Sequence, residues 1–324
     1  MLPFKRLLTI NVITGQFIHL KPLSKFSSVL AELKLNLIKW KHPSKQILRL
    51  SRQAVKPQTP LLLLWTVPFL SSDTAVKEGS EVKKMSNQQK KEMNDAIVES
   101  DELFESNKYQ EATSALLPFK DINDVEVLWR ISRAQYKASQ SSSVSDAEKR
   151  QMIQEAYDSI TKAMELNDSH WAVHKWMSVL LDAQSSYDGI KARVTQLENV
   201  KRHMLKAVEL NPTDATTHYM LGSWCYQIAD MSWIQRKIAA TIFAAPPTST
   251  FEEALHFFSK AEEIEPRFYS QNLLMLGKTL LKLQKPKEAA QYLTLARDYP
   301  SSSEEDNTVR KEATEMLKKL KIED

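Results

Sequence analysis

The chain has 324 residues, of which 42% are apolar and 26% are charged, and its net charge is +4 at neutral pH. This composition is typical of a folded protein rather than a disordered one. Only five glycines are present, and no two lie close enough to form a phosphate-binding loop or a dinucleotide motif. They are also too few for the turns of a many-stranded sheet, so the composition favours helices. The single cysteine, Cys225, excludes an intramolecular disulfide and a multi-cysteine metal cluster.

Residues 1–57 form a strongly basic segment. They carry eleven Lys and Arg residues and one acid, Glu32, for a net charge of +10, which leaves −6 for residues 58–324. Leu, Ile and Phe among Lys and Ser, with few acids, are typical of an organelle transit peptide. The same composition suits a disordered extension that binds any anionic surface. We therefore interpret this segment as a basic N-terminal extension or a targeting segment.

Residues 58–84 combine a short apolar segment with a polar linker. The uncharged run 57–72 is shorter than the roughly 17 residues of a membrane-spanning helix and contains two internal prolines. A second interpretation places Trp65 and Phe69 at a membrane interface beside the basic segment. On that interpretation, residues 1–70 contact a membrane or an organelle surface.

From residue 85 onward the informative feature is repetition. In the tetratricopeptide pattern, a glycine in one helix precedes an alanine in the next helix by twelve residues. Gly277 and Ala289 have this spacing. Gly222 and Ala254 are separated by 32 residues, which predicts an insertion of twenty residues between their two helices.

Similar second-helix patterns recur along residues 85–324, with anchors at positions 112, 156, 200, 254 and 289. The spacings of 44, 44, 54 and 35 residues exceed the usual repeat of about 34. Longer loops or longer helices must absorb the difference. We predict an all-α, tetratricopeptide-like solenoid of antiparallel helix pairs, whose curvature exposes a groove for partners.

The small residues have a mechanical purpose in this fold. We expect Gly222, Ala254, Gly277 and Ala289 where paired helices approach most closely, because a packed interior leaves no room there for a branched side chain. Large aromatic side chains are expected to fill the core rather than bind a ligand. These are Trp129, Trp171, Trp176, Tyr219 and Trp224.

Several segments between residues 90 and 318 point to one family. They are 127–134, 174–176, 187–192, 206–215, 231–239, 243–250 and 268–278. The piece Ala-Val-Glu-Leu-Asn-Pro (207–212) is common to many tetratricopeptide proteins, whereas the tryptophan-containing insert that ends in Pro-Pro-Thr-Ser-Thr (246–250) is specific. On these segments the region resembles the regulator of microtubule dynamics family, whereas the basic N-terminal segment matches no pattern of it.

The resemblance implies association with microtubules, spindle organisation and chromosome segregation, and some members of the family are membrane-anchored or mitochondrial. We therefore expect a non-enzymatic microtubule-associated protein with tubulin as its partner. The expected location is cytoplasmic, on microtubules and the spindle, with a mitochondrial location as the alternative. We expect no cofactor and no specific nucleic acid.

A microtubule presents an acidic surface, so a binding protein needs clustered Lys and Arg. Seven residues form the candidate basic cluster: Lys191, Arg193, Lys201, Arg202, Lys206, Arg236 and Lys237. On a helix, Arg202 and Lys206 share a face, although Glu198 lies four residues before Arg202 and is placed to pair with it. A solvated helix surface without a partner is an equally open interpretation.

The insert contains a second pattern. Ile234, Ile238 and Ile242 recur every four residues and line one stripe of a helix, while Arg236 and Lys237 point elsewhere. We favour a stripe that closes the core between helix pairs. A lid or a docking helix is the alternative.

Catalytic and metal sites are poorly supported. His170 and His174 lie four residues apart and share a helix side, but no third ligand is indicated, so a packed or surface pair is the preferred interpretation. Nothing near Cys225 in the sequence lowers its pKa. We predict no catalytic residue and no metal site. The alternative to a microtubule-associated protein is an organelle-surface adaptor, or a helical-repeat protein that holds an apolar ligand.

Overall fold

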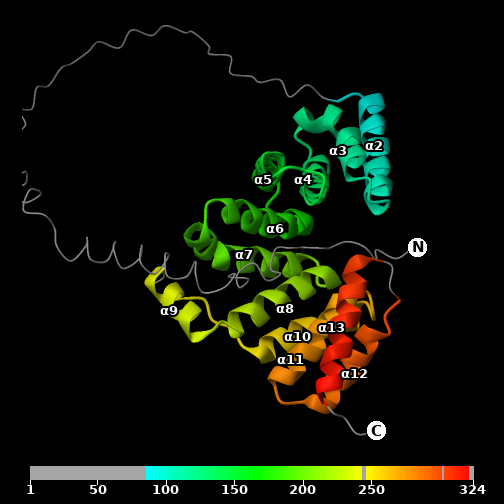
Figure 1. Cartoon of the computed structure of the whole chain (residues 1–324). Coiled ribbons are helices and arrows are strands. Elements are labelled where there is room, and N and C mark those ends of the chain that lie inside the picture. The colour runs from blue at the N-terminus through cyan, green and yellow to red at the C-terminus, as the bar shows by residue number, and fades with distance from the viewer. Residues whose placement is uncertain (1–84, 243–245, 301–302, 321–324) are drawn as a thin grey trace, which may run out of the picture. The chain divides into compact units, whose positions relative to one another are not determined.

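The computed structural model describes residues 85–242, 246–300 and 303–320, and those from Ser86 onward belong to one compact unit (Figure 1). Every element in these ranges is helical. The elements are α2 (Asn87–Glu105), α3 (Tyr109–Leu116), η2 (Leu117–Ile122), α4 (Val125–Ser139), α5 (Asp146–Leu166), α6 (Trp171–Tyr187), α7 (Ile190–Leu210), α8 (Ala215–Ala229), α9 (Trp233–Ile242), α10 (Phe251–Ile264), α11 (Ser270–Lys282), α12 (Pro286–Arg297) and α13 (Glu304–Leu320). The segments 1–57 and 58–84 lie outside the described residues.

The helices pack in successive pairs. The pairs are α2 with α3, α4 with α5, α6 with α7, α8 with α10, and α11 with α12. Each pair also contacts the next one, and α13 packs on α11 and α12. This arrangement confirms the predicted tetratricopeptide-like solenoid of helix pairs.

Local sequence explains where several helices begin. Ser86, Ser145 and Thr250 each form a capping box. The hydroxyl accepts a hydrogen bond from the backbone N–H three residues on, and the Gln or Glu side chain at that position accepts one from the backbone N–H of the cap residue. Asp124 and Asp214 accept backbone N–H bonds at the starts of α4 and α8. These caps satisfy amide groups that have no partner within the helix.

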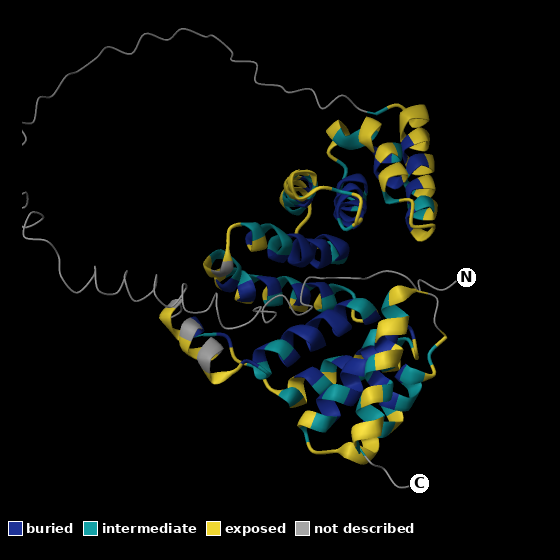
Figure 2. Ribbon diagram, in the orientation of Figure 1, coloured by how far each residue is buried: buried dark blue, intermediate teal, exposed yellow. Residues whose placement is uncertain are grey.

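Burial differs between the two helices of a pair. Nearly every face of α4, α6 and α8 is buried, whereas their partner helices keep an exposed face (Figure 2). A first helix contacts its own partner and neighbouring pairs as well, so it has few positions left for solvent. The five anchors predicted in the second helices are all buried: Ala112, Ala156, Val200, Ala254 and Ala289.

Longer helices absorb much of the excess repeat length. Helices α5 and α7 have 21 residues each, whereas α11 has 13 and α12 has 12. Between α8 and α10, the additional chain forms α9 and its connections, while α8 and α10 still pack directly on each other.

The helix glycines lie where a side chain would overlap a neighbour. A Cβ atom on Gly222 would lie 2.6 Å from Cδ1 of Phe258, and one on Gly277 would lie 2.6 Å from Cγ of Leu293. The nearest neighbour of each glycine is therefore the large residue that lies four positions after the paired alanine. Phe258 follows Ala254, and Leu293 follows Ala289. At Gly277 the carbonyl oxygen of Ala289 lies 3.4 Å from the same Cβ position.

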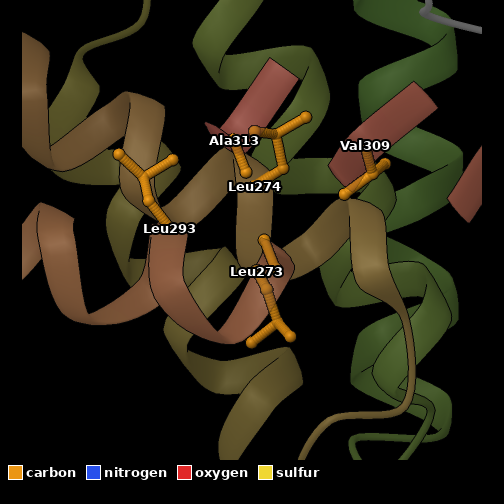
Figure 3. Close-up of a cluster of buried hydrophobic side chains, with 6 residues drawn as sticks. Leu273, Leu274, Leu293, Val309 and Ala313 are labelled. Carbon is orange, nitrogen blue, oxygen red and sulfur yellow. The ribbon is translucent and has the colours of Figure 1, made fainter. Parts of the chain in front are cut away.

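The last pair is closed by a single helix. Leu273 and Leu274 of α11 meet Leu293 of α12, and Val309 and Ala313 of α13 complete this cluster together with Ala296 (Figure 3). The apolar face that a further pair would cover is thus covered by α13. Terminal helices that close an array in this way are usual in repeat proteins.

Four of the five predicted core aromatics are buried: Trp129, Trp176, Tyr219 and Trp224. Trp171 is half-buried at the start of α6. Among the helices that the structure describes, none combines the length and the hydropathy needed to cross a bilayer.

Gly277→Ala should lower the free energy of unfolding by roughly 1–3 kcal/mol, because the new methyl group overlaps Leu293 in a packed core. Helix propensity alone would give the opposite sign, since alanine is favoured over glycine by about 1 kcal/mol. Urea denaturation of the full chain measures the difference.

The Leu293→Ala background provides the control. There the space beside the glycine is empty, so Gly277→Ala should be neutral or stabilising by about 1 kcal/mol. An equal loss of stability in both backgrounds would show that Leu293 is not the reason for the glycine.

Candidate functional site

The structure separates the residues of the predicted basic cluster on α7. Lys191 and Arg202 are exposed and Lys206 is half-buried on the solvent side of the helix. Arg193 and Lys201 turn toward neighbouring helices. The sequence therefore overestimates the positive charge that α7 offers to a partner.

Arg193 is held by a carboxylate of the preceding helix. Its Nε donates to Oδ1 of Asp182 and its Nη2 donates to Oδ2, both at 2.8 Å. Asp182 is buried, and burial raises the pKa of its carboxyl group while Arg193 opposes that rise. A paired guanidinium of this kind fixes the turn between α6 and α7 and is not available at the surface.

Lys201 and Lys206 also have intramolecular contacts. The ammonium of Lys201 lies 4.6 Å from the centre of the Trp224 ring on α8. Lys206 forms a 2.6 Å ion pair with Glu209, one turn further along α7. Within the described part of the chain no ion pair joins Glu198 to Arg202, so Arg202 has its charge in solvent.

The solvent side of α7 is thus only weakly positive. Lys191 and Arg202 are eleven residues apart, or about 16 Å along the helix axis. Glu198 and Glu209 lie exposed on the same side. Any attraction to an acidic partner comes from a few separated cations rather than from a dense patch.

Both basic side chains of the insert are exposed, but the guanidinium of Arg236 is bonded to backbone carbonyls. Arg236 donates from Nε to the carbonyl of Met231 at 3.0 Å and from Nη2 to that of Ala229 at 3.4 Å. Its guanidinium therefore ties α9 to the end of α8. Lys237 is exposed, with its ammonium 5.6 Å from the ring of Trp233.

The predicted isoleucine stripe cannot be placed, since the side chains of Ile234, Ile238 and Ile242 lie outside the described residues. Helix α9 itself packs against α7. Its Ala239 is buried, and its Trp233 is 71% exposed.

Sequence reasoning missed a charged network that joins α2, α4 and the start of α6. Arg130 pairs with Asp101 at 2.9 Å and with Glu126 at 2.5 Å, and Arg133 also contacts Asp101. His170 lies 2.9 Å from Glu126, and this hydrogen bond lowers the pKa of the Glu126 carboxyl to about 2. The partners lie up to 44 residues apart in sequence, so no local pattern indicates them.

Aromatic rings complete this network. The Arg133 guanidinium lies 4.1 Å from the centre of Phe104 and 4.8 Å from that of Trp129. Burial lowers the pKa of Arg133 to about 10, so the group remains charged at neutral pH. Because these side chains are engaged with one another, the network joins helix pairs and offers little to a ligand.

The two histidines considered as a metal pair have different partners. His170 contacts Glu126, whereas His174 meets His203 of α7, with the two Nδ1 atoms 2.9 Å apart. His174 Nε2 lies 2.6 Å from the carbonyl of Asp168 and must donate to it. His174 Nδ1 then accepts a hydrogen bond from the N–H at His203 Nδ1.

Burial, with contributions from His174 and Arg202, lowers the pKa of His203 to about 4. Cys225 is buried in α8, and burial raises the pKa of its thiol. Over the described ranges, no group of three or more His, Cys, Asp or Glu side chains is arranged to hold a metal ion.

Known proteins match the helical region. Residues 96–321 match the family described as Regulator of microtubule dynamics protein 1-3. Regulator of microtubule dynamics protein 1 of Bos taurus is 43% identical over 70% of this chain and 72% of its own length. Regulator of microtubule dynamics protein 3 of Rattus norvegicus is 33% identical over 59% of this chain and 40% of its own. A thermophilic TPR protein of Thermus thermophilus aligns with 13% identity and a TM-score of 0.49, over 68% of this chain and 98% of its own.

His203→Asn should remove part of the pH dependence of stability. The folded-state pKa of about 4 lies below the ordinary value near 6.5, so neutral His203 stabilises the fold above pH 6.5 and this contribution is lost as pH falls through about 4. Asparagine keeps an N–H donor for His174 and does not titrate. Urea midpoints between pH 7.5 and 4 should therefore fall less in the variant than in the wild type.

His256→Asn is the matched control, because His256 is exposed on α10. Its urea midpoints should match those of the wild type over the whole pH range. A parallel decline of the wild type and the His203 variant would contradict the assignment.

Proposed function

Since this chain belongs to the regulator of microtubule dynamics protein 1-3 family, we propose that it regulates microtubule dynamics as a non-enzymatic microtubule-associated protein. The observation that carries this proposal is the extent of the family match, which runs from α2 to the end of α13. We extend the proposal to spindle organisation and chromosome segregation. The proposed location is the cytoplasm, on microtubules and the spindle.

The solvent-facing cations of α7 and α9 are the proposed contact with tubulin. They are the exposed Lys191, Arg202 and Lys237, together with the half-buried Lys206. The two helices pack on each other, so these cations belong to neighbouring elements of one unit. Because the body of the protein is acidic, such exposed cations direct an acidic partner to a limited part of its surface.

A non-enzymatic role is supported by the buried charged side chains, which pair with one another. Lys175 pairs with Asp214 at 2.8 Å between α6 and the start of α8, and Arg193 pairs with Asp182. These buried pairs lie at the joints between neighbouring helices. Their charges are used in packing, and the thiol of Cys225 has a raised pKa that disfavours the nucleophilic thiolate.

Reversing two charges on α7 tests the contact. The variant Arg202→Glu with Lys206→Glu should weaken co-sedimentation of the full chain with polymerised tubulin roughly five- to tenfold at low salt. Wild-type binding should itself weaken steeply as salt rises, because the attraction is screened. Thermal unfolding checks that the variant remains folded.

Lys90→Glu with Lys91→Glu is the matched control, since both residues are exposed on α2 and the net charge changes equally. It should retain most of the binding. Equal losses in the two variants would remove α7 from the contact, and no co-sedimentation of the wild type at low salt would overturn direct association.

A further inference from the structure

The surface feature that the proposed function leaves unexplained is the first residue of α9. Trp233 is 71% exposed, more than any other large hydrophobic residue in the described ranges. The next is Val98 at 57%. Tryptophan is normally well buried in soluble proteins, so an indole in solvent indicates an interaction surface.

The contacts of α9 with the rest of the protein leave Trp233 exposed. Arg236 ties α9 to the end of α8, Ala239 is buried, and α9 packs on α7. The opposite face then points outward. It carries Trp233, Lys237, Ala240 and Thr241, which are all exposed and recur at the spacing of one helix side.

The chemistry of this face is aromatic and cationic. Residues 231–251 contain Arg236 and Lys237 and no acid. The ammonium of Lys237 lies 5.6 Å from the indole ring, so charge and ring face solvent together. An anionic partner that also accepts an indole is complementary to this face.

Size distinguishes the candidate partners. A helix of ten residues is about 15 Å long. Its exposed side chains, among those that the structure describes, are Trp233, Arg236, Lys237, Ala240 and Thr241. A specific protein interface needs about 800 Å² from each partner, which such a face does not supply alone. A bilayer requires no matching pocket, since indole rings settle at the headgroup level and lysines reach the anionic headgroups.

We propose that α9 is a membrane-docking helix, which places Trp233 in the headgroup region of an anionic bilayer and Lys237 against the lipid phosphates. Arg236 acts as the positioning residue, because its bonds to Met231 and Ala229 hold the indole outward. A single ring and one cation give weak, reversible attachment. The docking surface shares Lys237 with the proposed tubulin contact, whereas Trp233 belongs to the docking surface alone and the α7 cations belong to the tubulin contact alone.

Vesicle flotation of the full chain tests the proposal. Trp233→Ala should reduce binding to phosphatidylcholine vesicles containing phosphatidylserine about tenfold, and Lys237→Glu should reduce it by a smaller factor. Leu166→Ala is the matched control, because Leu166 is an exposed hydrophobic residue on α5. It should bind as the wild type does. A Trp233→Ala variant that binds such vesicles as well as the wild type would overturn the proposal.

Fluorescence quenching reports on the ring itself, whatever other segments contribute to binding. Brominated lipids should quench part of the tryptophan emission of the bound wild type, and Trp233→Phe should remove that part. Equal quenched emission in both proteins would also overturn the proposal. If Trp233→Ala instead loses only binding to an acidic polyglutamate peptide, the face belongs to a protein partner.

Microtubule co-sedimentation separates this inference from the proposed function. Trp233→Ala should co-sediment with polymerised tubulin as the wild type does, whereas the Arg202 and Lys206 reversal should leave vesicle quenching unchanged. Loss of both activities in either variant would contradict separate roles for Trp233 and the α7 cations.

Discussion

The close approach of two helices at a position without a side chain is the constraint on which the array depends. Gly222 and Gly277 leave the space that Phe258 and Leu293 fill from the facing helix, each at a separation that excludes one further methyl group. A glycine inside a helix costs about 1 kcal/mol relative to alanine, so its presence requires a packing benefit. Because the large residue completes the contact, each helix pair has a fixed separation, and the next pair can cover its remaining apolar face.

Charged groups at the contacts between helices follow from this stacking, both within a pair and between pairs. Arg193 with Asp182 and Lys175 with Asp214 are ion pairs whose four side chains keep little exposure. The network around Asp101 joins α2 to α4 and to the start of α6. Such pairs contribute little net stability, because desolvation offsets their attraction, but breaking one leaves a charge without a partner. The Lys and Arg side chains of these pairs thus serve assembly.

The proposed docking surface lies where the repeat is interrupted. Between α8 and α10 the chain departs from the pattern and forms α9, yet the two flanking helices still pack as a pair. The inserted helix is therefore free of the requirement to bury its outer face. It carries the most exposed large hydrophobic residue of the described ranges, Trp233, beside Lys237. A regular stack provides the rigid support, and the insertion provides a surface that the stack itself does not need.

The sequence by itself determined the helical class and the second-helix anchors from Ala112 to Ala289, because helix periodicity and small-residue spacing are local properties of the chain. The family followed from the resemblance of particular segments, chiefly the insert that ends in Pro-Pro-Thr-Ser-Thr (246–250). The sequence did not determine which cations reach solvent, that His174 meets His203, or that Trp233 alone among the helix-region tryptophans is exposed. Asp182 lies 11 residues from Arg193, and Glu126 lies 44 from His170. Only the packing of one helix on another brings such groups together, since pairing over these distances depends on how helices meet and not on neighbouring residues.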